Sequence, residues 1–172
     1  MSEVRRWGLS ALLGRVLRAL RQHAHKIRMV DGCEGISVLA HGASIGEHYR
    51  HVVQHFECVI RSIHSGEINY EARERNHRLE TAVTFAAIAT CDVLRAIKKY
   101  GMATLNRACT VVSTLRDLAS RPLFVETTVG RELAYCIGNA IHHYTIVRQI
   151  AGQIGVEVPP EFAIARSSSS LV

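Results

Sequence analysis

Apolar residues recur every three or four positions along three long stretches of this chain, which is the spacing of one helix face. The first stretch follows Ser44, which forms a capping-box pattern with Glu47 three residues later, and it runs to about His64. The second stretch, 69–101, begins with a charged turn and then carries an apolar stripe from Leu79 to Ile97, and the third spans 127–152. Each is long enough to predict a helix that buries one face against its neighbours.

The amino-terminal segment 1–30 predicts a further helix with a basic outer face. Leucines recur there at helical spacing, and cations lie among them: Arg5, Arg6, Arg15, Arg18, Arg21, Lys26 and Arg28. Such a segment is a helix of the fold, a targeting leader or a helix on a membrane surface, and its residues do not separate these alternatives. We expect an all-α, up-and-down four-helix bundle with its domain at 31–166 and a Ser-rich tail at 167–172.

One internal segment departs from the helical pattern. Residues 105–118, "LNRACTVVSTLRDL", are rich in β-branched side chains and show no clear helical period. Their local propensity favours a strand, with an irregular connection as the alternative. A helical domain can carry either as a long connection.

Composition limits the function classes. The 172 residues fit one domain, and no apolar run reaches the ~20 residues that a bilayer crossing needs. The five cysteines form no CxxC pair, which argues against a disulfide scaffold and favours a reducing, cytoplasmic setting. Basic residues give a net charge of +6 but are not interleaved with aromatics, so we expect no nucleic-acid partner.

Histidines on two of the predicted helices suggest a site between them. His48, His51 and His55 share one face of the first helix, and His142 and His143 lie on the third. Helices that face each other in a bundle can bring such side chains together across the core. Two charged runs, Arg73-Glu74-Arg75 and Arg131-Glu132, are either solvated ion pairs, which we favour, or functional charges near the mouth of a pocket.

Four segments in this order and spacing resemble the DinB-like superfamily, in a branch of mostly uncharacterised bacterial proteins. The similarity runs from about Gly42 to Ser168 and is carried by "ASIGEHYRHVVQHF", "NYEARERN", "RELAYCIGNAIHHYTIVRQIAGQIGVEVPPEF" and "IARSS". The resemblance implies a four-helix bundle, often dimeric, that holds a divalent metal, commonly zinc or nickel. Family members of known activity include thiol-dependent transferases and isomerases.

The resemblance also implies a ligand set with one departure from the family pattern. The early histidine corresponds to His51, with His48 one turn earlier as its rival, and the later His-x-x-x-His pair corresponds to Asn139 and His143. An amide in place of an imidazole weakens a zinc or nickel site. With the metal site so weakened, we still expect a divalent-metal-dependent enzyme of the thiol-dependent transferase or hydrolase class, acting on a small molecule. The alternative is a non-catalytic, small-molecule-binding or dimeric bundle in which Asn139 is a structural amide.

Overall fold

The computed structural model describes residues 43–116, 120–153 and 155. In chain order its elements are α2 (Ile45–Ser65), β1 (Glu67–Ile68), α3 (Arg78–Thr81), α4 (Val83–Lys98), α5 (Met102–Leu105), β2 (Ala108–Arg116), β3 (Pro122–Thr128) and α6 (Val129–Gln153). The predictions for 1–30 and 167–172 fall outside the described residues. The described part combines helices with a three-stranded sheet, so the fold is mixed α/β and the predicted all-α four-helix bundle is wrong.

Helix α2 begins and ends where the sequence predicts. The hydroxyl of Ser44 accepts from the backbone N–H of Glu47 at 3.1 Å, and the Glu47 carboxylate accepts from the backbone N–H of Ser44 at 2.7 Å. At the other end Gly66 has a φ of 76°, the left-handed conformation that glycine adopts at low cost. The capping box and the helix stop are therefore confirmed.

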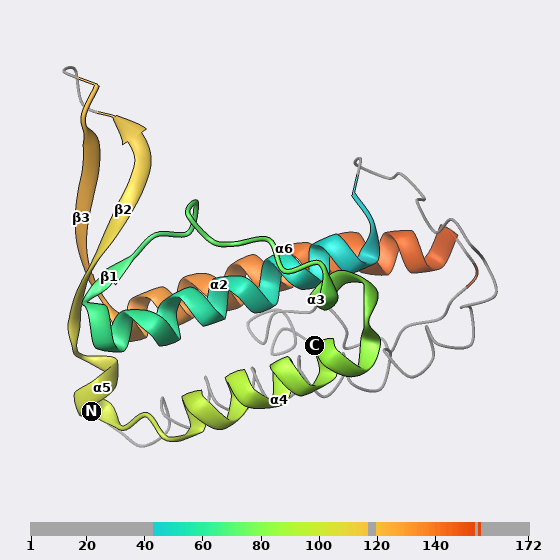
Figure 1. Cartoon of the computed structure of the whole chain (residues 1–172), viewed down its shortest axis with the longest axis horizontal. Coiled ribbons are helices and arrows are strands. Elements are labelled where there is room, and N and C mark those ends of the chain that lie inside the picture. The colour runs from blue at the N-terminus through green and yellow to red at the C-terminus, as the bar shows by residue number, and fades with distance from the viewer. Residues whose placement is uncertain (1–42, 117–119, 154, 156–172) are drawn as a thin grey trace, which may run out of the picture.

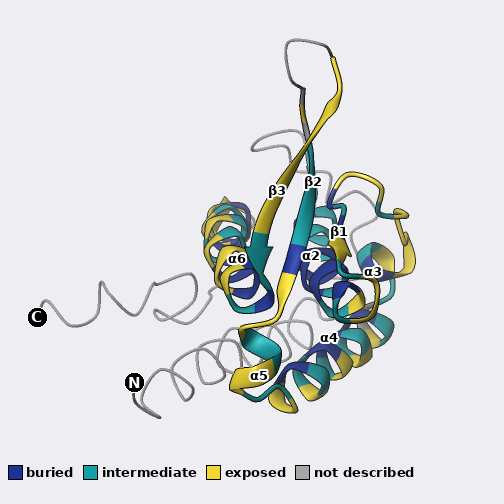
Figure 2. Ribbon diagram, turned by 90° about the vertical axis from the view of Figure 1, so that its left-hand side faces the viewer, coloured by how far each residue is buried: buried dark blue, intermediate teal, exposed yellow. Residues whose placement is uncertain are grey.

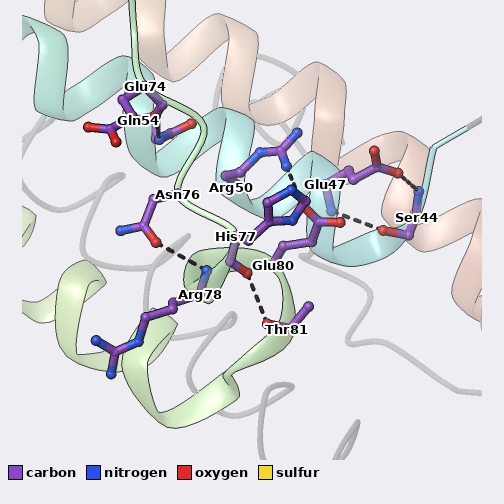
Figure 3. A network of polar contacts seen from close by, with 10 residues as sticks. All are labelled: Ser44, Glu47, Arg50, Gln54, Glu74, Asn76, His77, Arg78, Glu80 and Thr81. Atoms are coloured by element: carbon purple, nitrogen blue, oxygen red, sulfur yellow. Dashed lines mark hydrogen bonds and ion pairs between the residues drawn. The ribbon is translucent and has the colours of Figure 1, made fainter.

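The charged turn predicted at the start of 69–101 is an irregular segment, and the long helix predicted after it is divided into α3 and α4. Figure 3 shows how polar side chains hold this segment to α2: Arg50 pairs with Glu80, and Gln54 donates to the backbone carbonyl of Glu74. The side chain of Asn76 accepts from the backbone N–H of Arg78 at 3.1 Å. Such side-chain bonds offer the backbone an alternative to a continuing helix.

The sheet has the strand order β1-β2-β3. Strand β1 runs parallel to β2, and β2 pairs antiparallel with β3 from Ala108 opposite Thr128 to Arg116 opposite Pro122. The strand expected within 105–118 is confirmed as β2, whereas β3 was not predicted. The hairpin rises from one end of the helices (Figure 1), and most of β3 is exposed (Figure 2).

The core lies along α2, which packs against α6 on one side and α4 on another. Helices α2 and α6 run side by side for most of their length (Figures 1 and 2). The buried core to which they contribute includes Phe56 of α2 and Leu133 of α6, each 1 % exposed. This packing places the inner face of α2, including its histidines, against α6.

The helices in the described ranges are too short or too polar to cross a membrane. That result agrees with the expectation of no membrane span. The expected homodimer and the expected cytoplasmic setting stay predictions.

Candidate functional site

Four imidazole rings form a contiguous cluster where α2 meets α6. The Nδ1 atoms of His48 and His143 lie 2.8 Å apart, close enough to share a hydrogen. The ring centre of His51 lies 4.3 Å from that of His143 and 4.1 Å from that of His55. The structure therefore brings together the histidines that the sequence placed on facing helices.

His142 belongs to the cluster only at its edge. Its side chain is exposed, and its ring meets that of His143 edge-on, with 5.3 Å between the ring centres. The turn of α6 thus directs His143 toward α2 and leaves His142 toward solvent.

Burial keeps the imidazoles of His51, His55 and His143 uncharged at neutral pH. It lowers the pKa of His51 to about 3, and the neighbouring His55, His143 and Arg73 lower it further. Burial also lowers the pKa of His143 to about 4, helped by His48. The pKa of His55 is lowered as well, again chiefly by burial.

Two hydrogen bonds fix where the ring hydrogens lie. Arg73 can only donate, so the 2.9 Å contact from its guanidinium makes Nδ1 of His51 the acceptor and leaves the ring hydrogen on Nε2. His55 is the reverse case. Its Nδ1 lies 2.7 Å from the backbone carbonyl of His51, which can only accept, so Nδ1 carries the hydrogen and Nε2 keeps the lone pair.

These contacts do not fit the expected metal site. The nitrogens of two imidazoles on one tetrahedral zinc ion stand roughly 3.3–3.4 Å apart, whereas His48 and His143 approach to 2.8 Å. The lone pair on Nδ1 of His51 already accepts from Arg73. Within the described ranges, no group of three or more His, Cys, Asp or Glu side chains is arranged to hold a metal ion. The expected metal-binding arrangement is thus wrong, while zinc or nickel as a cofactor stays an untested prediction.

Asn139 lies one turn before His143 on the same side of α6, at the position where the family resemblance calls for histidine. Its Nδ2 is buried and has no hydrogen-bond partner among the described residues. Among the described residues, Nδ2 of Asn139 therefore does not make the hydrogen bond to a facing histidine that the structural-amide hypothesis expects.

A pocket of about 310 Å³ opens beside the cluster. The helix α2, the segment after β1, the hairpin and the start of α6 all contribute to its wall, which consists of His55, Tyr70, Glu71, Val111, Val112, Ser113, Val125, Arg131, Glu132 and Tyr135. His55 belongs to both the cluster and the pocket. It is therefore the residue through which a pocket ligand would meet the histidines.

A buried carboxylate organises the pocket wall next to α6. Glu132 is 1 % exposed, and it accepts from the hydroxyls of Tyr70 at 2.9 Å and Thr127 at 2.8 Å and from the guanidinium of Arg131 at 2.7 Å. These three donors compensate the charge that burial would otherwise penalise. The nearby thiol of Cys136 stays protonated, because burial raises its pKa to about 12.

Three aromatic rings adjoin one another along the same wall. His55 and Tyr70 are stacked, with 5.0 Å between ring centres and 17° between ring planes. Tyr135 is tilted against both, at 5.5 Å from Tyr70 and 6.4 Å from His55. The wall is therefore an aromatic surface in which one ring is tilted against two stacked ones, and the buried Glu132 carboxylate adjoins it.

Several of these residues were not singled out from the sequence. Tyr70 and Tyr135 gave no signal, because a tyrosine in a polar segment or on a helix face is common. The interpretation of Arg131-Glu132 as a solvated pair is wrong for Glu132, which is buried. Arg73 lies in one of the charged runs, and its contact with His51 spans 22 residues that no local pattern connects.

Comparison with known proteins gives one partial similarity. The chain is 29 % identical over 101 residues to "FK506-binding protein 5" of Rhizopus delemar, a match that covers 59 % of this chain and 26 % of that protein. The match thus spans about a quarter of the length of that curated relative. No family model matches the chain, and no solved structure matches it. The resemblance to the DinB-like superfamily is therefore not supported by a family match.

Proposed function

We propose that this chain is an enzyme that binds a small organic molecule in the pocket and uses Nε2 of His55 to accept a proton from it. The observation that carries the proposal is the position of His55, which lines the pocket while its Nδ1 is tied to the backbone carbonyl of His51. A neutral imidazole with one nitrogen fixed as a donor presents its other nitrogen as a base.

The proton transfer conserves charge within the site. A ligand N–H or C–H bond breaks, its electron pair stays on the ligand atom, and the proton forms a new N–H bond at Nε2 of His55. Burial, and after it the positive charge of Arg73, lower the pKa of His55, although its hydrogen bond to the His51 carbonyl and the Glu71 carboxylate act in the opposite direction. The lowered pKa favours return of the proton once the ligand has reacted.

The surrounding residues support binding more than they take part in the transfer. Tyr70 stacks on the His55 ring and is itself held by the Glu132 carboxylate. Arg73 donates to the backbone carbonyl of Tyr70 and to His51, so it links the segment after β1 to the cluster. A ligand would thus meet a base whose ring cannot turn freely.

The experiment follows the histidine rings by NMR while small molecules of different charge are added. We expect a pocket ligand to shift the ring resonances of His55 and to leave those of His64, an exposed residue on the same helix, in place. His55→Gln should abolish any conversion of the ligand, and His64→Gln should leave it unchanged. Ligands that bind but shift no resonance of His55 would contradict the proposal.

A non-catalytic small-molecule-binding protein is the second candidate. The low pKa values of His51 and His143, about 3 and 4, make these two rings weak bases at neutral pH. A ligand that binds and is recovered unchanged after incubation with the wild type would favour this candidate over the enzyme.

A further inference from the structure

We infer that the pocket recognises a small organic cation, a protonated or methylated amine. The inference deepens the proposed function and shares its pocket: a protonated amine would also be a proton source for His55, whereas recognition depends on the aromatic rings and on the charge of the lining. The rings of His55, Tyr70 and Tyr135 adjoin one another along one wall, with 5.0–6.4 Å between their centres. Neighbouring aromatic faces attract a cation through their negative quadrupoles.

The charges around the pocket also favour a cation. Glu132 and Arg131 also line the pocket, and they compensate each other through their 2.7 Å contact. Glu71 lines the pocket as well, and its side chain is exposed. Its carboxylate is left as the excess charge of the lining, because the imidazole of His55 is neutral. The net charge of the lining is therefore negative and complements a cation.

Another part of the lining suits the apolar groups of such an amine. It comes from the hairpin, where Val111, Val112 and Val125 line the pocket together with Ser113. The volume of about 310 Å³ lies at the lower end of the range for ligand pockets, about 300–1,000 Å³. The N-methyl groups, over which the positive charge is spread, would face the tyrosines, while the carbon chain of the ligand would contact the valines.

The experiment compares three probes of similar shape. Choline carries the charge, 3,3-dimethylbutan-1-ol is its neutral isostere, and 3,3-dimethylbutanoate is an anion of the same bulk. NMR titrations at pH 7 should give the tightest binding for choline, by about 2- to 30-fold over the isostere, as expected for a cation–π contact. Choline has no N–H group, so its binding tests recognition independently of proton transfer.

Matched variants test whether choline binds through the aromatic rings and the Glu71 carboxylate. Tyr135→Leu should weaken choline binding several-fold, whereas Tyr135→Phe, which keeps the ring, should leave it nearly unchanged. Glu71→Gln should also weaken it, and Glu126→Gln, an exposed carboxylate on β3 that does not line the pocket, should have no effect. Tyr135 is 45 % exposed, so its replacement leaves the core intact.

Each outcome separates this inference from the proposed function. If the neutral or anionic probe binds as tightly as choline and shifts the His55 resonances, the inference of a cation is wrong while the proposed function stands. If choline binds and discriminates as expected but His55→Gln does not impair conversion of any amine, only the proposed function fails. Absence of binding by all three probes overturns the inference of a cation and leaves the proposed function to its own ligand screen.

Discussion

The guanidinium of Arg73 donates a hydrogen bond to Nδ1 of His51 at 2.9 Å, so two basic side chains from different segments are in direct contact. The contact requires a neutral ring, because an imidazolium would have no lone pair to accept with. It therefore couples the protonation of the cluster to the position of the segment that also carries Tyr70.

Replacing Arg73 should make His51 easier to protonate. In Arg73→Gln we expect the pKa of His51 to rise above about 3 and to stay below its ordinary value, because burial, the largest cause of its depression, remains. NMR titration of the ring resonances measures the pKa of His51 in each variant. Arg75→Gln, an exposed neighbour in the same run, is the control, and an equal rise in both variants would show that Arg73 has no special role.

Acid should destabilise the fold through the cluster. The pKa values of His51 and His143 are about 3 and 4 in the folded state, below the unfolded value of ~6.5. Above pH 6.5 both rings are mostly neutral in the folded and in the unfolded chain, so their low pKa values do not reduce the free energy of unfolding. As the pH falls from 6.5 toward 4, the unfolded chain takes up protons that the folded chain refuses, and stability is lost.

Urea denaturation at pH 7 and pH 5 measures this loss. After allowance for screening of the half-buried rings, we expect about 1–3 kcal/mol less stability at pH 5. The double variant His51→Gln, His143→Gln should show a much smaller difference, and His64→Gln should behave as the wild type. Parallel pH profiles for all three proteins would contradict the assignment.

The wild-type cluster should bind zinc or nickel weakly. Arg73 occupies a lone pair of His51, and Asn139 provides an amide where the family resemblance calls for an imidazole. Asn139→His combined with Arg73→Gln should raise affinity by about 10- to 100-fold in a competition titration, with Arg75→Gln as control. Tight metal binding by the wild type itself would show that a metal rearranges these contacts.

Removing the Tyr70 hydroxyl should destabilise the fold, because the buried Glu132 carboxylate loses one of its donors. Tyr70→Phe leaves the carboxylate with Thr127 and Arg131 as donors, and we expect a loss of about 1–3 kcal/mol in the free energy of unfolding at pH 7. The paired variant Tyr70→Phe, Glu132→Gln should recover part of it, because no buried charge then lacks its donor. Recovery of none would indicate that the hydroxyl stabilises the fold in another way.

Two glycines inside helices should respond in opposite directions to alanine. A Cβ at Gly46 in α2 would meet the backbone carbonyl oxygen of Glu80, whereas a Cβ at Gly138 in α6 meets nothing within 4 Å. Gly46→Ala should therefore destabilise the fold by about 1–3 kcal/mol, and Gly138→Ala should stabilise it by about 0.5–1 kcal/mol. Thermal unfolding of the two variants checks the signs, and equal shifts would refute the close approach of α3 to α2.

The parts of the fold that the sequence predicted are those with local causes. The start of α2 depends on Ser44 and Glu47, which are three residues apart, and α6 depends on its own apolar period. Strand β3 went unpredicted because Pro122–Thr128 is stabilised by pairing with β2, which is a tertiary contact. The break before α4 has the same origin, since the polar segment is held by side chains of α2.

The candidate site likewise has a part that the sequence predicted and a part that depends on tertiary contacts. The shared face of His48, His51 and His55 follows from helix geometry, and their approach to His143 followed from the expectation that two amphipathic helices pack together. The role of Arg73 did not follow, because its position depends on the path of an irregular segment. The buried state of Glu132 did not follow either, since a charge is buried only when donors from several elements surround it.

The packing of α2 against α6 also bears on how this chain folds. The two helices carry the cluster between them, yet His48 and His143 lie 95 residues apart in sequence. The conformational entropy of closing so long a loop must be lost before the core contacts can compensate for it. Association of these two helices is therefore expected to be the slow event in folding, with the hairpin, whose strands are close in sequence, forming early.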